Sequence, residues 1–143
     1  MKLIYSKIEE DRLLHIIYKV ADFKNIINGH RKDIINEKEF LQLSALKMSK
    51  GQTFRPHKHI WKKGEDKVIA QESWVIIKGS VKCSFYDLNN SLLSEPILNV
   101  GDCSVTLAGG HTYSILEDDT LVYEYKTGPY KGQEEDKVFI DEV

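Results

Sequence analysis

The sequence predicts an all-β protein, and two observations lead to this expectation. Of its 143 residues, 43 are Val, Ile, Phe, Tyr, Trp or Thr, and only four are Ala. Side chains that are branched or bulky near the backbone suit a pleated sheet, whereas Ala is the best helix former. In addition, short apolar or alternating segments recur about every ten residues, with turn-forming residues between them. Such a succession of short strands indicates a β-sandwich or a small barrel.

A short N-terminal extension precedes the regularly spaced strands. Residues 13–20 are rich in β-forming side chains and predict its strand. Asp22 can cap a short helical turn over residues 23–27. Residues 39–50 then predict a longer strand, but its apolar side chains change from one face to the other at residues 45–46. This change of phase predicts a bulge or bend.

The middle of the chain holds the clearest strand patterns. Residues 53–61 are a strand candidate, and the charged segment 62–67 predicts a solvated loop or hairpin tip. Residues 74–77 are apolar on both faces, as expected for an interior strand between two layers. Residues 81–86 alternate between apolar and polar side chains, which indicates a strand with one buried face.

The C-terminal part predicts three further strands and leaves one open question. The strands are expected over residues 97–100, 103–107 and 121–125. After Pro129 the chain is polar until residues 138–140, which either pack back as a final strand or lie free.

Composition excludes several classes of protein. A length of 143 residues fits one domain, and a net charge of −2 argues against a nucleic-acid-binding surface. The two cysteines, Cys83 and Cys103, are too few for a disulfide scaffold, so we expect them to be small buried side chains. No apolar run approaches the roughly 20 residues of a membrane helix, and the charged N-terminus lacks a signal-peptide core. We therefore expect a cytoplasmic protein that binds neither nucleic acid nor membrane.

Two histidines, His57 and His59, are spaced so that they share one face of a strand. Two imidazoles on one face can converge on a metal ion, which needs nitrogen donors at about 2.1 Å. The flanking lysines favour the alternative of a surface histidine pair. The pair alone leaves both interpretations open.

A longer pattern surrounds this pair. The first part reads Gly51-x5-His57-x-His59, then a gap, then Glu72-x6-Gly79, and the second part reads Gly101-x5-Leu107-x-Gly109-x-His111. These segments resemble the two motifs of the cupin superfamily and span residues 51–116. The resemblance implies a double-stranded β-helix, which is a jelly-roll barrel. We accordingly expect one cupin domain over residues 1–143, with the motif-bearing barrel at about 39–127 and a short N-terminal extension of strand and helical turn.

The same resemblance implies a metal site. By position in the motifs, the ligands are His57, His59, Glu72 and His111. Three imidazoles and a carboxylate suit a divalent transition metal, and this set admits Fe, Mn, Ni, Cu or Zn. A buried histidine pair that works without metal is the alternative, because histidine can act as a base near neutral pH.

The chain departs from the cupin motifs at two ligand positions. Twelve residues separate His59 from Glu72, so Gln71 and Glu65 compete with Glu72 for the carboxylate position. Glu72 is preferred because its spacing to the following glycine is intact and because it shares strand parity with apolar residues. His111 arrives one residue early, and its alternative role is that of a turn residue that caps backbone carbonyls.

Three other side chains are candidates for contacts with substrate. Arg55 shares strand parity with His57 and can hold a carboxylate or phosphate, although a surface ion pair is the alternative. Tyr113, with His57 and His59, is a candidate for proton transfer, and Tyr125 is a candidate for substrate binding. Aromatic residues on strands more often belong to the core.

The segments around Glu72, His111 and 125–130 are similar to those of small cupins from bacterial surface-polysaccharide gene clusters. This likeness implies a sugar-like ligand and a link to sugar-nucleotide metabolism. Three hypotheses follow: a metal-binding cupin that binds or transforms a carbohydrate-like molecule, a metal-free sugar-nucleotide isomerase or epimerase with a histidine base, and a non-catalytic binding module. The resemblance also implies a homodimer, and an N-terminal strand at 13–20 would otherwise leave an exposed edge.

Overall fold

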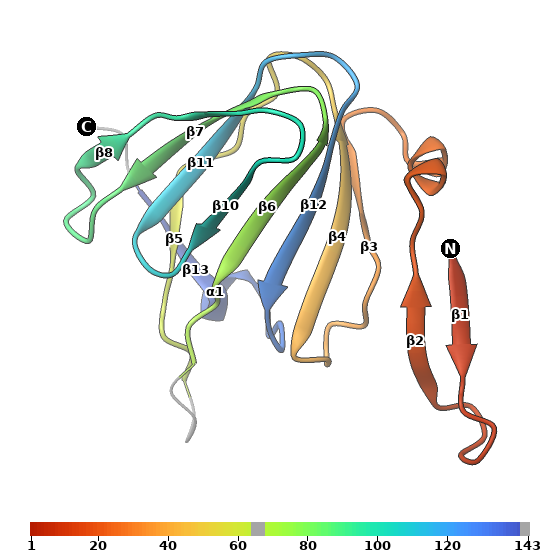
Figure 1. Cartoon of the computed structure of the whole chain (residues 1–143). Helices are drawn as coiled ribbons and strands as arrows, with labels where there is room; N and C mark the ends of the chain where they lie inside the picture. The colour runs from red at the N-terminus through yellow and green to blue at the C-terminus, as the bar shows by residue number, and fades with distance from the viewer. Residues whose placement is uncertain (64–67, 141–143) are drawn as a thin grey trace.

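The computed structural model describes residues 1–63 and 68–140 and consists mainly of antiparallel strands in two facing sheets (Figure 1). The first sheet has the strand order β10-β6-β12-β4-β3. Its strands are β3 (His30–Asp33), β4 (Leu41–Met48), β6 (Glu72–Lys78), β10 (Cys103–Thr106) and β12 (Thr120–Thr127).

The second sheet has the strand order β13-β5-β11-β7-β8, and β9 also pairs with β7. Its strands are β5 (His57–His59), β7 (Val81–Tyr86), β8 (Leu92–Ser94), β9 (Ile97–Leu98), β11 (Gly110–Ile115) and β13 (Lys137–Phe139), the last preceded by the short helix α1 (Gln133–Asp136). From β4 to β7, and again from β10 to β13, successive strands alternate between the two sheets. This alternation defines a double-stranded β-helix and confirms the predicted fold class.

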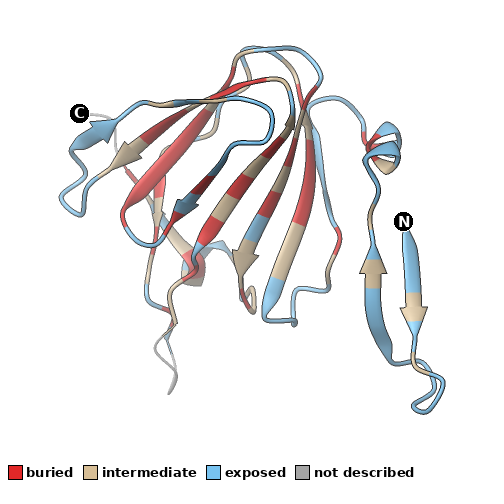
Figure 2. Cartoon of the chain, in the orientation of Figure 1, coloured by how far each residue is buried: buried red, intermediate tan, exposed pale blue. Residues whose placement is uncertain are grey.

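The main core lies between the two sheets, and both sheets contribute buried strands to it (Figure 2). Trp74 and Ile76 on β6 face Cys83 on β7 and Tyr113 and Ile115 on β11. Their alternation with less buried neighbours follows the period of two that directs every second side chain of a strand inward.

The N-terminal extension forms a sheet of its own and a helical turn. Strands β1 (Lys2–Tyr5) and β2 (Leu13–Ile17) pair with each other, and a 3-10 helix, η1 (Val20–Asn25), follows. Phe23 of η1 packs with Ala45 on the outer face of β4. No helix in the described part of the chain is both long and apolar enough to cross a membrane.

The expected bulge in residues 39–50 is wrong. Strand β4 keeps an unbroken register with β12 from Leu41 to Met48. Its apolar side chains change face because both faces are buried: Ala45 packs under the N-terminal extension, whereas Leu46 and Met48 enter the barrel core.

Other local expectations need correction at the ends of elements. The strand expected over 53–61 is shorter in the structure and corresponds to β5. Residues 110–115, for which the sequence pattern predicted no strand, form β11. Asp22 lies inside η1 rather than before it, and its carboxylate accepts the backbone N–H of Lys19 at 2.8 Å. Cys83 is buried as expected, but Cys103 is exposed.

Lys62, at the start of the segment predicted to be solvated, and the C-terminal tail both pack against the barrel. Lys62 is buried, and its Nζ donates to the carbonyl of Pro129 at 2.6 Å. Residues 64–67 of the predicted loop lie outside the described residues. The tail packs back on the barrel, because β13 pairs with β5.

Candidate functional site

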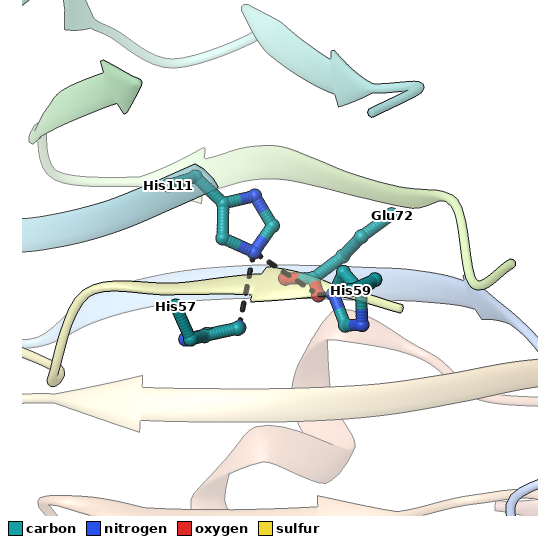
Figure 3. Close-up of side chains that lie close together, drawn as sticks. All are labelled: His57, His59, Glu72 and His111. Carbon is teal, nitrogen blue, oxygen red and sulfur yellow. Dashed lines mark hydrogen bonds and ion pairs between the residues drawn. The ribbon is translucent and has the colours of Figure 1, made fainter. Parts of the chain in front are cut away.

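Four side chains from three strands meet inside the barrel (Figure 3). His57 and His59 point inward from β5, and the intervening Lys58 does not. His111 comes from the neighbouring strand β11, where it is paired with His57. Glu72 reaches them from β6 in the opposite sheet, while Gln71 is exposed. The structure therefore brings together the four residues that the sequence pattern selected.

The donor atoms of these four side chains converge on one point. The Nε2 atom of His111 lies 3.2 Å from Nε2 of His57 and 3.5 Å from Oε2 of Glu72. The Nε2 atom of His59 lies 2.9 Å from the same carboxylate oxygen. All four donors lie within 4.8 Å of one another. Donors that share one ion at about 2.1 Å lie about 3–3.5 Å apart, so this spacing fits a divalent metal.

The second ring nitrogen of each histidine has a partner of its own. Nδ1 of His57 lies 3.1 Å from the carbonyl of Arg55, and Nδ1 of His111 lies 2.9 Å from Oγ1 of Thr106. Because a carbonyl only accepts, Nδ1 of His57 carries the proton and Nε2 keeps its lone pair. Such partners fix the ring orientation of histidines that bind metals.

Asp136, which is fully buried, approaches the third histidine from the end of α1. Its Oδ2 lies 3.3 Å from Nδ1 of His59, close enough for an ion pair although the ring N–H is not aligned for a hydrogen bond. Burial alone would lower the pKa of His59, but the carboxylates of Asp136 and Glu72 outweigh it and raise that pKa to about 9. Burial opposes ionisation of Asp136 as well, yet His59 and Lys126 hold its pKa at about 2.

The pKa values of two other groups of the cluster, His57 and Glu72, are both lowered, but for different reasons. Burial, together with the neighbouring His111 and Lys137, lowers the pKa of His57 to about 4. Burial would raise the pKa of Glu72, but its contacts with His111 and His59 hold it well below the ordinary value. In the absence of metal, the cluster therefore contains a neutral His57 beside an ionised carboxylate at neutral pH.

A hydrogen-bonded chain links this cluster to the outer strand β3. The indole N–H of Trp74 donates to Glu72 at 3.1 Å and to Glu124 at 3.0 Å. Glu124 in turn accepts from the guanidinium of Arg31 at 2.7 Å. Burial and the charge of Glu72 raise the pKa of Glu124 above its ordinary value, although Arg31 opposes this shift.

Comparison with known proteins identifies the fold. No protein-family model matches the sequence, and no curated protein matches it. Among solved structures, a protein with a double-stranded β-helix domain from Klebsiella pneumoniae subsp. pneumoniae MGH 78578 is 13% identical, with a TM-score of 0.63, and the match covers 97% of this chain and 98% of that one. The chain has the cupin fold.

Two further structures share this cupin fold. KdgF from Halomonas sp. is 20% identical, with a TM-score of 0.54, over 71% of this chain and 80% of that one. The capsular polysaccharide assembling protein CapF from Staphylococcus aureus is 17% identical, with a TM-score of 0.62, over 79% of this chain. The match covers 32% of CapF, so this chain corresponds to about a third of that protein.

The cupin barrel opens beside the cluster into a polar cavity of about 450 Å³. Lys126 lines this cavity and is the cross-strand neighbour of Glu72. Lys137 also lines it and is the cross-strand neighbour of His59. Directly paired residues project to the same face of a sheet, so the cavity and the four donors lie on the same inner side of the barrel, although none of the four donors lines the cavity.

The three other candidate residues lie in different places in the cupin barrel. Tyr113 is close to the cluster: its ring lies 5.3 Å from that of His111, stacks on Trp74 at 3.7 Å, and places its hydroxyl 3.4 Å from Ser104. Burial and the charge of Glu72 raise its pKa well above the ordinary value.

Arg55 and Tyr125 do not line the polar cavity. The guanidinium of Arg55 lies 4.0 Å above the ring of Phe139. Tyr125 points to the outer face of β12, where it lines a separate, mostly apolar pocket between β2 and the first sheet. The structure thus does not bring either side chain into the cavity beside the cluster.

Several residues of the site were not found from the sequence. Asp136 lies in a polar tail whose pattern gives no sign of burial. Glu124 did carry a signal, because it shares strand parity with the buried Val122 in a segment that is otherwise apolar and aromatic. Lys137 becomes recognisable only once β13 is known to pair with β5.

Proposed function

We propose that this chain is a metal-binding cupin that binds and transforms a small carbohydrate-like molecule. The observation that carries the proposal is the convergence of His57, His59, His111 and Glu72 beside a cavity of about 450 Å³. That volume suits a small ligand. In this proposal residues 1–143 form one cupin domain, which works in the cytosol. Its substrates are sugars or sugar nucleotides used to make surface polysaccharide.

The four donors would hold the ion, and the mixed nitrogen and oxygen set suits Fe, Mn, Ni, Cu or Zn. When bound, such an ion polarises a carbonyl or hydroxyl oxygen as a Lewis acid. The chain supplies the rest of the site. Asp136 and Thr106 orient two of the imidazoles, and the stacked rings of Trp74 and Tyr113 separate the cluster from the apolar core.

A metal-free isomerase or epimerase is a second candidate, and one observation favours it. His57 has a pKa of about 4 and faces the cluster with an unprotonated Nε2, so its lone pair is free of a proton at neutral pH. In this case His59, with its raised pKa, is available as the acid. Tyr113 is too deeply buried to reach a substrate without movement.

Metal content distinguishes the two candidates. Protein purified without an affinity tag is assayed by inductively coupled plasma mass spectrometry, together with His57→Ala, His111→Ala and the exposed control His30→Ala. Close to one metal ion per chain in wild type and His30→Ala, with loss in the other two variants, is expected. Wild type without metal that interconverts keto-sugar nucleotides would support the second candidate instead. Tight binding of a sugar without turnover would indicate a binding module.

We also propose that the chain forms a homodimer through its N-terminal hairpin. Strands β1 and β2 pair with each other but with no other strand of the described residues, so their outer edges are available for pairing. Exposed apolar side chains, including Leu3, Leu14 and Ile17, lie on this hairpin.

Light scattering after gel filtration tests the dimer. A lysine on an edge strand blocks pairing, so Ile17→Lys is expected to convert the dimer to a monomer. Ile8→Lys, at the exposed hairpin turn, is the control and should remain dimeric. A monomeric wild type would contradict the proposal.

A further inference from the structure

The polar cavity beside the cluster contains three cationic side chains, and their partners differ. Arg31 is bound on two sides, to Asp33 at 3.2 Å and to Glu124 at 2.7 Å. Lys126 lies 3.3 Å from Asp136 and 4.8 Å from the ring centre of Tyr130. Both charges are therefore already neutralised by the protein.

Lys137 is different from these two cations. Among the described residues, its ammonium group has no carboxylate within ion-pair distance and no hydrogen-bond partner. The side chain is nevertheless half-buried, because it starts on β13 beside His59 and lines the cavity. Burial and the neighbouring charge of Lys126 lower its pKa, and the more distant carboxylates of Glu72, Asp136 and Glu124 only partly oppose this shift.

A half-buried cation without a protein partner is costly, because taking a charge out of water needs compensation. A ligand with an anionic group supplies that compensation. Lys137 is also placed for such a role, since its cross-strand neighbour His59 is one of the four converging donors.

We propose that Lys137 is the anchor for an anionic group, a carboxylate or a phosphate, on the sugar-like ligand of this cavity. The inference rests on the proposed function and narrows its substrate class to acidic or phosphorylated sugars. The anionic group binds the ammonium of Lys137, and the rest of the molecule extends over the four donors. Of the other cations that line the cavity, Arg31 is paired with Asp33 and Glu124, and Lys126 is paired with Asp136, which leaves the anchoring to Lys137.

Calorimetric titration with three matched probes tests this assignment. D-Glucuronate and D-glucose 6-phosphate each carry one anionic group, whereas D-glucose carries none. We expect wild type to bind one of the anionic probes at least about tenfold more tightly than glucose, as for a charge-assisted hydrogen bond. Lys137→Met should remove this preference, and Lys137→Arg should retain most of it. Lys131→Met, an exposed lysine of the same segment, is the control.

Metal content is measured on every variant, so that failure of the anchor and failure of the metal site are separate outcomes. Retention of the anionic preference in Lys137→Met, or equal affinity of wild type for all three probes, overturns the anchor even if metal is bound. Loss of metal in Lys137→Met also overturns it, because Lys137 would then act through the cluster. An anionic preference in a wild type that binds no metal supports the anchor and contradicts the metal proposal. Whether glucuronate or glucose 6-phosphate binds better identifies the anionic group.

Discussion

The two halves of the barrel interior are built on the same strands but have opposite chemistry. Along four strands, the inward-facing positions are apolar at one end and ionisable or polar at the other. The corresponding residues are Leu46 and Ser44 on β4, Ile76 and Glu72 on β6, Ile115 and His111 on β11, and Val122 and Glu124 on β12. One set of strands therefore supports both a core and a candidate site.

This contrast shows how the fold accommodates a destabilising cluster. Buried charges lose hydration, and their mutual attraction only partly restores the lost free energy. In the apolar half, side chains such as Leu46, Ile76 and Val122 are almost completely buried and contribute hydrophobic stability. We infer that the apolar half stabilises the strands on which the polar half is displayed, so substitutions in the two halves should have separable effects.

The largest expected effect is a loss of stability from a substitution in the apolar half that leaves the polar half unchanged. Ile76→Ala creates a cavity in the apolar half and should lower the free energy of unfolding by about 2–5 kcal/mol. Metal content per folded chain should not change, because Ile76 lies four residues from Glu72 along β6, with Trp74 between them on the same face. Urea denaturation and metal analysis measure the two quantities.

Leu107→Ala is the matched control for Ile76→Ala. This leucine is 62% exposed, so its truncation should change stability by less than about 0.5 kcal/mol. If Ile76→Ala loses metal while its folded state remains as stable as wild type, the division between the halves does not hold.

Trp74 lies at the boundary between the apolar and polar halves, and its substitution is expected to have the next largest effect on stability. Trp74→Phe keeps a ring against Tyr113 but removes the N–H that Glu72 and Glu124 share. Oε1 of Glu72 and Oε2 of Glu124 then each lose the indole as donor, and stability should fall by about 1–3 kcal/mol. Thermal and urea unfolding of metal-free protein measure this loss. Equal stability of Trp74→Phe and wild type would show that the N–H has no role in joining the two halves.

The apolar half was largely predictable from the sequence, for a physical reason. A strand with one buried face alternates with a period of two, and residues 81–86 show this directly. Local periodicity does not reveal the fold where a strand is buried on both faces. In β4 the outer face is covered by the N-terminal extension, and a local pattern cannot distinguish this from a bulge.

The polar half was predictable only in part. His57 and His59 share a face by strand geometry, and Glu72 follows from its parity with Trp74 and Ile76. Asp136 and Lys137 could not be found in this way, because their positions depend on the pairing of β13 with β5 across a long separation in sequence. The ligand set came from the resemblance to the cupin motifs, and strand parity supported His57, His59 and Glu72 but not His111. The supporting residues depend on tertiary contacts.

Asp136 provides a test of such a supporting residue. Asp136→Asn keeps the size of the side chain but removes the charge beside His59. Outer partners of ligating histidines typically contribute 10–100-fold to metal affinity, and we expect a loss in this range. Competition with a metal-binding dye measures the affinity, and Glu134→Gln, an exposed acid of the same helix, is the control. Unchanged affinity in Asp136→Asn would show that the histidines are held by the barrel alone.

The last expected effect is the pH dependence of the stability of the metal-free protein on the alkaline side. The pKa of His59 is about 9 in the folded chain and about 6.5 when unfolded. Because the folded state holds the extra proton, this stabilisation is complete below pH 6.5 and is lost as the pH rises through 9. The slope is at most about 1.4 kcal/mol per pH unit. His57, with a pKa of about 4 in the folded chain, is neutral there throughout this range. It adds a slope of opposite sign only near pH 6.5, where the unfolded imidazole still binds part of a proton.

Urea unfolding of chelator-treated protein between pH 6.5 and 9 measures this decline, and His59→Gln serves as the reference. Without the titrating imidazole, the variant should lose less stability over the same range than wild type. Ile76→Ala should show the wild-type slope from a lower starting value, because its cavity lies in the other half and does not alter the charges around His59. Parallel curves for wild type and His59→Gln would mean that Asp136 and Glu72 do not hold a proton on His59. The polar half would then make no pH-dependent contribution through this residue.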